Sequence, residues 1–275
     1  MRAEQEVCDL GDVKTRGETA GHDEPGLRAS ALRIAKKGYA RVLDAVDEAT
    51  PTYRRLMGSA FARVTGGPFG ALRAVAVQFP FTPEEVLLGY TAGLFPTVQD
   101  GRHYWESPDP RSVLMLEKLR IPSRVRTYIN KGLFEFAFDR DPAAVVHGCA
   151  NREHSWLTPT MQSTFLALHE LGAMHTVEAR KGGQLVGGAF GLAIGSVFTL
   201  ESMFSAEDHA SKLAFAFLGK HLAARKFSLI DCQFHKATFA QFGAEPITRL
   251  DYRSRLARGL VNPPSFLPER SRHES

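Results

Sequence analysis

The sequence predicts an α+β fold, in which an antiparallel sheet packs against helices and a smaller, mainly helical region precedes the sheet. Two stretches carry this prediction. Residues 175–204 read as three consecutive strands joined by tight turns, and residues 210–232 read as an amphipathic helix followed by a short apolar strand. The chain has 275 residues and is 44% hydrophobic, so it is large enough to bury a substantial core.

Charge and cysteine content narrow the possible classes of function. The net charge of +4 permits a nucleic-acid partner without requiring one. Cys8, Cys149 and Cys232 are far apart and form no pattern of zinc ligands or disulfides, so we expect no metal site. The polar start of the chain and the lack of a run of about 20 apolar residues predict a cytoplasmic protein without a membrane anchor.

The N-terminal part divides into two predicted segments. Residues 1–30 are polar, glycine-rich and mixed in charge, which predicts a disordered tail. Residues 31–106 form the mainly helical region, where helical spacing on both sides of Pro51 indicates two helices. Another helix is expected to begin after Thr82, whose side chain suits an N-cap, and to end near Gly93. A loop rich in proline and glycine follows.

Residues 107–262 form the predicted catalytic domain, and residues 263–275 a C-terminal tail. Apolar runs and helical spacing define the elements of the first half of this domain. In chain order, the sequence predicts a strand at 113–116, a basic helix at 123–131, a strand at 134–138, and helices at 141–149 and 160–171.

The second half of this domain is the most regular part of the chain. Strands are predicted at 175–180, 185–194 and 197–204, a helix at 210–225 and a strand at 229–232. Gly187, Gly188 and Gly191 lie inside the middle strand, where glycine often marks a bulge or a close backbone approach. This is the central order of the GNAT acyltransferase fold, so we expect a cleft where the strands splay.

Several short segments between residues 93 and 244 follow one another in a characteristic order and spacing. They are Gly93-Leu94-Phe95-Pro96, Ser107-Pro108-Asp109-Pro110-Arg111, Trp156-Leu157-Thr158, His169-Glu170-Leu171-Gly172, Leu185-Val186-Gly187-Gly188, Glu201-Ser202-Met203-Phe204-Ser205, Ala210-Ser211-Lys212, Ile230-Asp231-Cys232-Gln233-Phe234-His235 and Gly243-Ala244. Together these segments resemble the leucyl/phenylalanyl-tRNA–protein transferase family.

The resemblance implies an aminoacyltransferase of the leucyltransferase type. The α-amine of a protein that starts with Arg or Lys would attack the aminoacyl ester of a charged tRNA. That protein would gain an N-terminal Leu, Phe or Met, an N-end-rule modification that leads to degradation. The ester is already activated and the α-amine has a pKa of about 7.7–8.0, so positioning, a proton acceptor and oxyanion stabilisation suffice without a cofactor. We expect a monomer.

Asp231 and Gln233 are the candidate catalytic residues. They lie two positions apart at the end of a predicted strand, so their side chains are expected to share a face. We hypothesise that Asp231 orients or polarises the attacking amine, either directly or through Gln233. The alternative is that Asp231 only caps a neighbouring loop.

The resemblance also implies a residue that recognises the acceptor protein. Glu201 follows Val197–Leu200 in the predicted strand at 197–204 and would hold the basic N-terminal residue of the acceptor, because a carboxylate can pair with Arg through two hydrogen bonds. The alternative for Glu201 is a surface salt bridge.

The transferred side chain requires an apolar pocket, and the family motifs suggest which residues line it. The implied pocket residues are Ala189, Phe198, Phe215, Leu218 and Ile230. Ordinary core packing is at least as good an explanation for each of them alone. Trp105 and Trp156 are candidates for stacking on the terminal adenine of the tRNA or for walling the cleft, with a structural core role as the alternative.

One basic run suits the phosphates of a tRNA acceptor stem. It contains no acidic residue and consists of Lys118, Arg120, Arg124, Arg126 and Lys131. The alternative is a solvated basic face without a nucleic-acid partner.

Two other functions remain open. A GNAT acyltransferase that uses acyl-CoA would need a glycine-rich loop to hold a pyrophosphate, but residues 205–212 contain no glycine and two acidic residues that would repel it. A non-catalytic tRNA- or peptide-binding protein would keep the basic run, but it would not need Asp231, Gln233 and Glu201 together.

Overall fold

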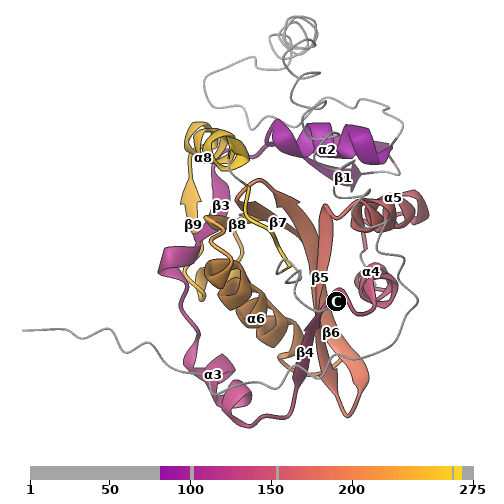
Figure 1. The fold of residues 1–275 in the computed structure, drawn as a ribbon, viewed down its shortest axis with the longest axis vertical. Helices are drawn as coiled ribbons and strands as arrows, with labels where there is room; N and C mark the ends of the chain where they lie inside the picture. The colour runs from indigo at the N-terminus through magenta and orange to yellow at the C-terminus, as the bar shows by residue number, and fades with distance from the viewer. Residues whose placement is uncertain (1–80, 100–101, 153–154, 262, 268–275) are drawn as a thin grey trace, which may run out of the picture.

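A computed structural model describes residues 81–99, 102–152, 155–261 and 263–267 of the chain (Figure 1). The predicted tail at 1–30 and the two helices around Pro51 lie outside these residues. The described part contains a seven-stranded mixed sheet with the strand order β4-β5-β6-β7-β8-β3-β9 and a separate two-stranded hairpin, β1-β2. The predicted α+β class with a GNAT-like order of elements is confirmed.

The segment before the sheet is partly different from the prediction. Helix α2 (Pro83–Thr91) begins as expected, since the Thr82 hydroxyl accepts a hydrogen bond from the backbone N–H of Glu85. The expected loop after it is instead an antiparallel hairpin of β1 (Phe95–Gln99) and β2 (Arg102–Glu106). Each strand of a two-stranded hairpin has one open edge, and for this reason a proline such as Pro96 is tolerated there.

The elements of the main domain agree closely with the predicted strands and helices up to residue 233. They are β3 (Arg111–Met115), the 3₁₀ turn η1 (Leu116–Lys118), α3 (Ser123–Asn130), β4 (Glu135–Phe138), α4 (Pro142–Ala150), α5 (Pro159–Glu170), β5 (Met174–Lys181), β6 (Gln184–Ile194), β7 (Val197–Ser205), α6 (Ala210–Ala224) and β8 (Leu229–Gln233). Four elements of this domain were not predicted: the short turn η1, α7 (Ala237–Ala240), β9 (Glu245–Ile247) and α8 (Arg249–Val261). In the described ranges, no helix is both long and apolar enough to cross a membrane.

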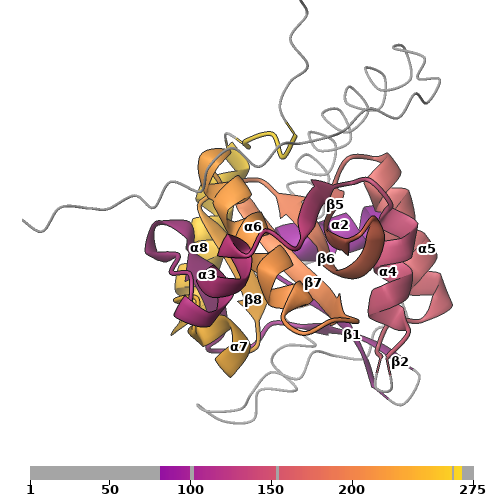
Figure 2. The same cartoon turned by 90° about the horizontal axis from the view of Figure 1, so that it is seen from below.

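Helices cover both faces of the sheet. Figure 2 shows α6 on one face and α4 and α5 on the other. The two faces carry separate apolar clusters, and neighbouring strand residues alternate between them: Ile230 belongs to the cluster around α6, whereas Leu229 belongs to the cluster around α4 and α5. A site between the strands can therefore draw on side chains from both layers.

The sheet opens between β7 and β8. These two strands are parallel, and their last paired residues are Thr199 and Asp231, so the chain segments that follow are free to diverge. On its other side β7 pairs with β6, and the register between them shifts by one residue: Gly191 pairs with Leu200, whereas Phe190 pairs with Ser202. Glu201 is therefore the extra residue of a β-bulge, a feature that re-aims a side chain.

Candidate active site

Glu201 and Gln233 meet across the opening between β7 and β8. The side-chain amide nitrogen of Gln233, Nε2, donates a hydrogen bond to Oε1 of Glu201 at 3.0 Å. Glu201 lies at the bulge, and Gln233 has a left-handed backbone with φ of 62°. Because of this backbone, the alternation of a regular strand does not set the direction of the Gln233 side chain. Two local irregularities thus bring together side chains from two diverging strands.

Asp231 lies beneath this pair and is fully buried. Its carboxylate accepts hydrogen bonds from Nε and Nη2 of Arg111 at 2.8 and 2.5 Å, and from the Tyr252 hydroxyl at 2.8 Å. It also accepts one from the backbone N–H of Gln233 at 2.9 Å. This last bond spans two residues, as in an Asx turn, and holds the left-handed backbone of Gln233 in place.

Arg111 is a buried residue of the candidate site that the sequence pattern did not single out. Its guanidinium carbon lies 4.5 Å from the ring centre of Phe95 and 4.4 Å from that of Tyr252. Burial opposes the charge, but the attraction of the Asp231 carboxylate outweighs it and the pKa of Arg111 is raised. Arg111 is the last residue of the family segment at 107–111, and this position was the one feature of the sequence that could have identified it. Nothing in the sequence pointed to Tyr252, which lies on the unpredicted helix α8.

Glu201 and Tyr90 together form the polar centre of the site. Both are buried, and neither the Tyr90 hydroxyl nor Oε2 of Glu201 has a hydrogen-bond partner of good geometry among the described residues. Burial raises the pKa of Glu201 to about 8, although the nearby Tyr90 hydroxyl lowers it in part. The repulsion of the Asp231 charge adds to the increase. A buried carboxylate of this kind does not fit the alternative of a surface salt bridge.

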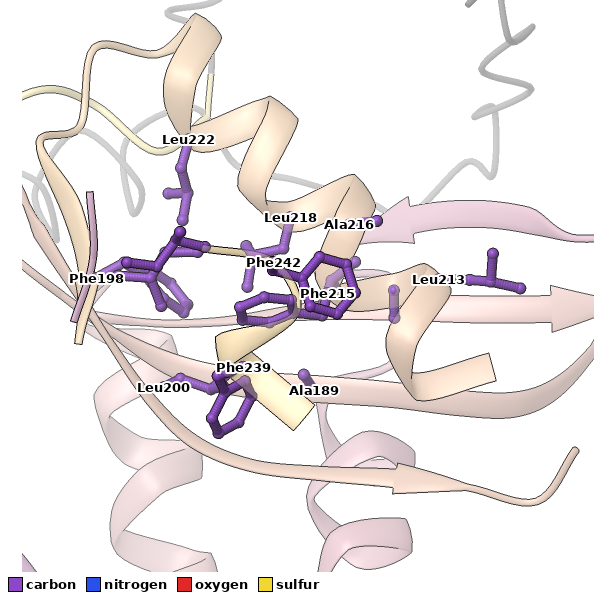
Figure 3. Close-up of a cluster of buried hydrophobic side chains, with 14 of the residues drawn as sticks. Ala189, Phe198, Leu200, Leu213, Phe215, Ala216, Leu218, Leu222, Phe239 and Phe242 are labelled. Carbon is purple, nitrogen blue, oxygen red and sulfur yellow. The ribbon is translucent and has the colours of Figure 1, made fainter. Parts of the chain in front are cut away.

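The five predicted pocket residues are brought together on the α6 side of the sheet. They come from β6, β7, β8 and α6, and all are buried in one apolar cluster, most of which is shown in Figure 3. Phe215 packs against Phe239 and Phe242, with ring centres 5.2 and 4.9 Å apart. The two partner rings lie in and beside α7, a helix that the sequence analysis did not predict, so their contribution was missed.

The two tryptophans lie on the other side of the sheet, in and against the second cluster. Trp105 on β2 is 8% exposed and packs edge-on against Tyr90, with ring centres 6.4 Å apart. Its ring also occupies the space where a side chain at Gly89 would lie. This placement favours the structural role for Trp105. Trp156 is half-buried and packs edge-on against Phe165 at 6.3 Å, so part of its ring remains accessible.

The basic run lies on η1, α3 and the segments that flank them, and all five side chains are exposed. Lys118 differs from the other four because its ammonium group forms an ion pair with the Glu245 carboxylate, with 2.6 Å between nitrogen and oxygen. Lys131 lies over the ring of Tyr128, with its nitrogen 4.8 Å from the ring centre. The run therefore presents several cations to solvent, as a phosphate-binding face requires.

The chain matches one protein family in both the family model and individual relatives. The family model described as leucyl/phenylalanyl-tRNA protein transferase matches residues 113–257. The chain is 42% identical over 187 residues to the leucyl/phenylalanyl-tRNA–protein transferase of Pseudomonas entomophila (strain L48), covering 66% of this chain and 83% of that protein. It is 41% identical over 189 residues to the protein of that name from Pseudomonas putida (strain KT2440), covering 67% of this chain and 84% of the relative.

Among solved structures, a GCN5-related N-acetyltransferase from Kribbella flavida aligns with 14% identity and a TM-score of 0.33, covering 57% of each chain.

Proposed function

Because this chain belongs to the leucyl/phenylalanyl-tRNA–protein transferase family, it is an aminoacyltransferase, and we propose that it moves Leu, Phe or Met onto proteins that start with Arg or Lys. Family membership gives the coarse activity, which joins an aminoacyl group from tRNA to a protein. The choice of acceptor and of amino acid, and an N-end-rule role in the cytoplasm, are our proposals. The acceptor preference rests on the chemistry of the residues around Glu201, the choice of amino acid on the apolar cluster under α6, and the N-end-rule role on the family resemblance.

The observation that carries the acceptor preference is a pair of buried oxygens, one on Tyr90 and one on Glu201, that have only each other as neighbouring polar partners of the right kind among the described residues. Tyr90 Oη and Glu201 Oε2 are both shielded from water, and neither makes a hydrogen bond of good geometry within the described residues, although the two side chains lie close enough to interact with each other. Leaving such groups unpaired costs about 1–3 kcal/mol each. A guanidinium or ammonium group from the acceptor supplies the missing donors, and its charge favours the ionised form of Glu201 despite the raised pKa.

Gln233 is the residue that we assign to the attacking amine. Its NH₂ group donates to Glu201, which leaves the amide oxygen as the acceptor for the incoming α-amine. The basic side chain and the amine of the acceptor would then bind to neighbouring groups. Asp231 is fully buried and bonds to the Gln233 backbone, so we propose that it acts through Gln233 rather than directly on the amine.

The proposed aminoacyl pocket directly adjoins this centre. Phe198 and Ile230 pair with each other one position before Thr199 and Asp231, where β7 and β8 separate. When the carbonyl of the aminoacyl ester lies at this opening, the side chain of the amino acid can therefore extend into the cluster under α6. The attacking amine then approaches from the side of Glu201 and Gln233. The proposal needs no enzyme-bound intermediate, because holding the two reactants together can supply much of the rate enhancement.

A direct experiment is to incubate the protein with a mixture of aminoacyl-tRNAs and one of four peptides, then identify the added residue by mass spectrometry. The peptides start with Arg, Lys, Ala or N-acetyl-Arg. We expect Leu, Phe or Met to be added to the first two only. Equal modification of the Ala peptide would contradict the acceptor role of Glu201. Modification that depends on acyl-CoA instead of tRNA would support the GNAT acyltransferase alternative, and no transfer at all would support a binding protein.

A further inference from the structure

The chain after α8 returns to the sheet and inserts an aromatic ring into the proposed aminoacyl cluster. Phe266 is 3% exposed and belongs to the same apolar cluster as the five pocket residues. Its backbone carbonyl accepts a hydrogen bond from Nε2 of His221 at 2.8 Å. Arg225 donates to the carbonyls of Ser265 and Leu267 at 2.9 and 3.1 Å. Residues 265–267 are therefore held against the end of α6 by three hydrogen bonds.

The ring of Phe266 is fixed by other rings. It stacks on His175 with ring centres 4.0 Å apart and an angle of 7°, and Nδ1 of His175 is itself held by Asp139 at 2.7 Å. Phe138 meets Phe266 edge-on at 5.4 Å. The ring of His221 lies 4.8 Å away, and Phe198, a proposed pocket residue, stacks on Phe266 at 5.7 Å and 28°. Phe266 therefore lies between the side chains of His175 and Phe138, which fix its position, and the pocket residue Phe198.

The position of Phe266 lies beyond Phe198 when viewed from the catalytic centre. Phe198 precedes Glu201 by three residues along β7, a distance of roughly 10 Å. Helix α6 runs antiparallel to β7, from the end of β7 back towards its start, since its first residue, Ala210, packs at Gly187, which pairs with Ser205 at the end of β7. The group that holds Phe266, His221, lies in the last turn of α6.

We propose that Phe266 is a specificity-determining residue that forms the closed end of the aminoacyl pocket. By packing behind Phe198 it limits how far a transferred side chain can extend from the opening between β7 and β8. This inference rests on the proposed transferase function and on the pocket residues assigned above. An apolar pocket discriminates between side chains mainly through its size, so its end wall decides between Leu and Phe.

The test is to vary the size of residue 266 and to measure kcat/KM for one tRNA body charged in turn with Leu, Met or Phe. Phe266→Leu leaves space behind Phe198, so we expect the ratio of Phe to Leu transfer to rise about tenfold. Phe266→Trp pushes Phe198 towards the opening, so the same ratio should fall. Opposite shifts in the two variants are the specific signature of an end wall.

Phe227→Leu is the matched control. Phe227 is also buried in this cluster and touches Phe266 from another direction, with ring centres 6.4 Å apart. The control should lose stability to a similar degree, measured by urea unfolding, without a change in the ratio. The inference is overturned if folded Phe266 variants keep the wild-type ratio, or if Phe227→Leu shifts it equally. If only one Phe266 variant folds, the direction of its shift decides. A wild-type protein that transfers no amino acid would instead refute the function itself.

Discussion

Arg111 and Asp231 form a two-pronged ion pair, in which Nε donates to Oδ1 at 2.8 Å and Nη2 donates to Oδ2 at 2.5 Å, with both side chains at most 1% exposed. The pair joins β3 to β8, and Tyr252 from α8 donates to the same carboxylate. Asp231 also accepts from the Gln233 backbone. The position of Gln233 therefore depends on segments that are more than a hundred residues apart in the chain.

We expect Arg111→Met to lower the free energy of unfolding by about 3–5 kcal/mol, because it leaves the buried carboxylate of Asp231 without its counter-charge. Urea unfolding followed by circular dichroism measures the loss. The double variant Arg111→Met/Asp231→Leu should recover much of this stability, since an apolar pair needs no charge compensation. A double variant as unstable as the sum of the single variants would show that the two charges are not coupled. Recovered stability without recovered activity is the expected outcome for a positioning pair.

The raised pKa of Glu201 predicts a pH-dependent contribution to stability. Burial raises this pKa from 4.5 to about 8, so the folded protein binds the proton more tightly than the unfolded chain does. The stabilisation is fully present below about pH 4.5 and is lost as the pH rises through about 8. Compared with Glu201→Gln, the wild-type protein should lose about 1 kcal/mol of unfolding free energy per pH unit between roughly pH 5 and 8. Parallel pH curves for the two proteins would contradict the assignment.

Glu201→Gln should also change acceptor preference. The amide keeps the shape of the carboxyl but cannot carry a charge, so kcat/KM for Arg- and Lys-starting peptides should fall about tenfold or more. A peptide that starts with Ala, which is a poor substrate, should be affected much less. Tyr90→Phe removes only one acceptor oxygen and should show the same selectivity with a smaller loss. An equal loss for every peptide would mean that Glu201 acts elsewhere in the reaction.

Gln233→Gly separates the side chain from its unusual backbone. Glycine adopts the left-handed conformation without strain, so the unfolding free energy should change by no more than about 1 kcal/mol. The transfer rate should nevertheless fall by about 10- to 100-fold, because the amide no longer positions the amine. Lys226→Gly is the matched control: Lys226 is exposed, has φ of 64° and lies before the start of β8, whereas Gln233 lies at its end. It should keep full activity. Full activity in Gln233→Gly would exclude the side chain from the reaction.

The exposed cations of the basic run predict a salt-dependent affinity for tRNA. Each phosphate contact that is removed should reduce the slope of log affinity against log salt by about 0.7–0.9. We expect this for Arg124→Gln and Arg126→Gln, measured by filter binding at several salt concentrations. Lys118→Gln should have a smaller effect, because Lys118 is already paired with Glu245. Identical slopes for all variants and the wild type would place the tRNA on another face.

Local patterns were sufficient for the secondary structure of the central domain. Helix α4 shows why: the side chain of Asp141 accepts from the N–H of Ala144, and Pro142 occupies the first helical turn, so the start signal lies within four residues. The β1-β2 hairpin was missed because prolines and glycines near its ends resembled a loop. Helix α8 was missed for a different reason, since its charged face gives little apolar periodicity, although Tyr252 and Leu256 are buried.

The sequence by itself determined the fold class, the family and the identity of Asp231, Gln233 and Glu201 as the residues of interest, because short motifs and strand periodicity are local properties. The tertiary structure alone decided how these residues are held. The bulge that turns Glu201 and the left-handed backbone of Gln233 appear only in the folded sheet, and the contacts of Arg111, Tyr252 and Phe266 join segments distant in the chain. Such contacts arise only when layers pack, so no pattern in the sequence specifies them.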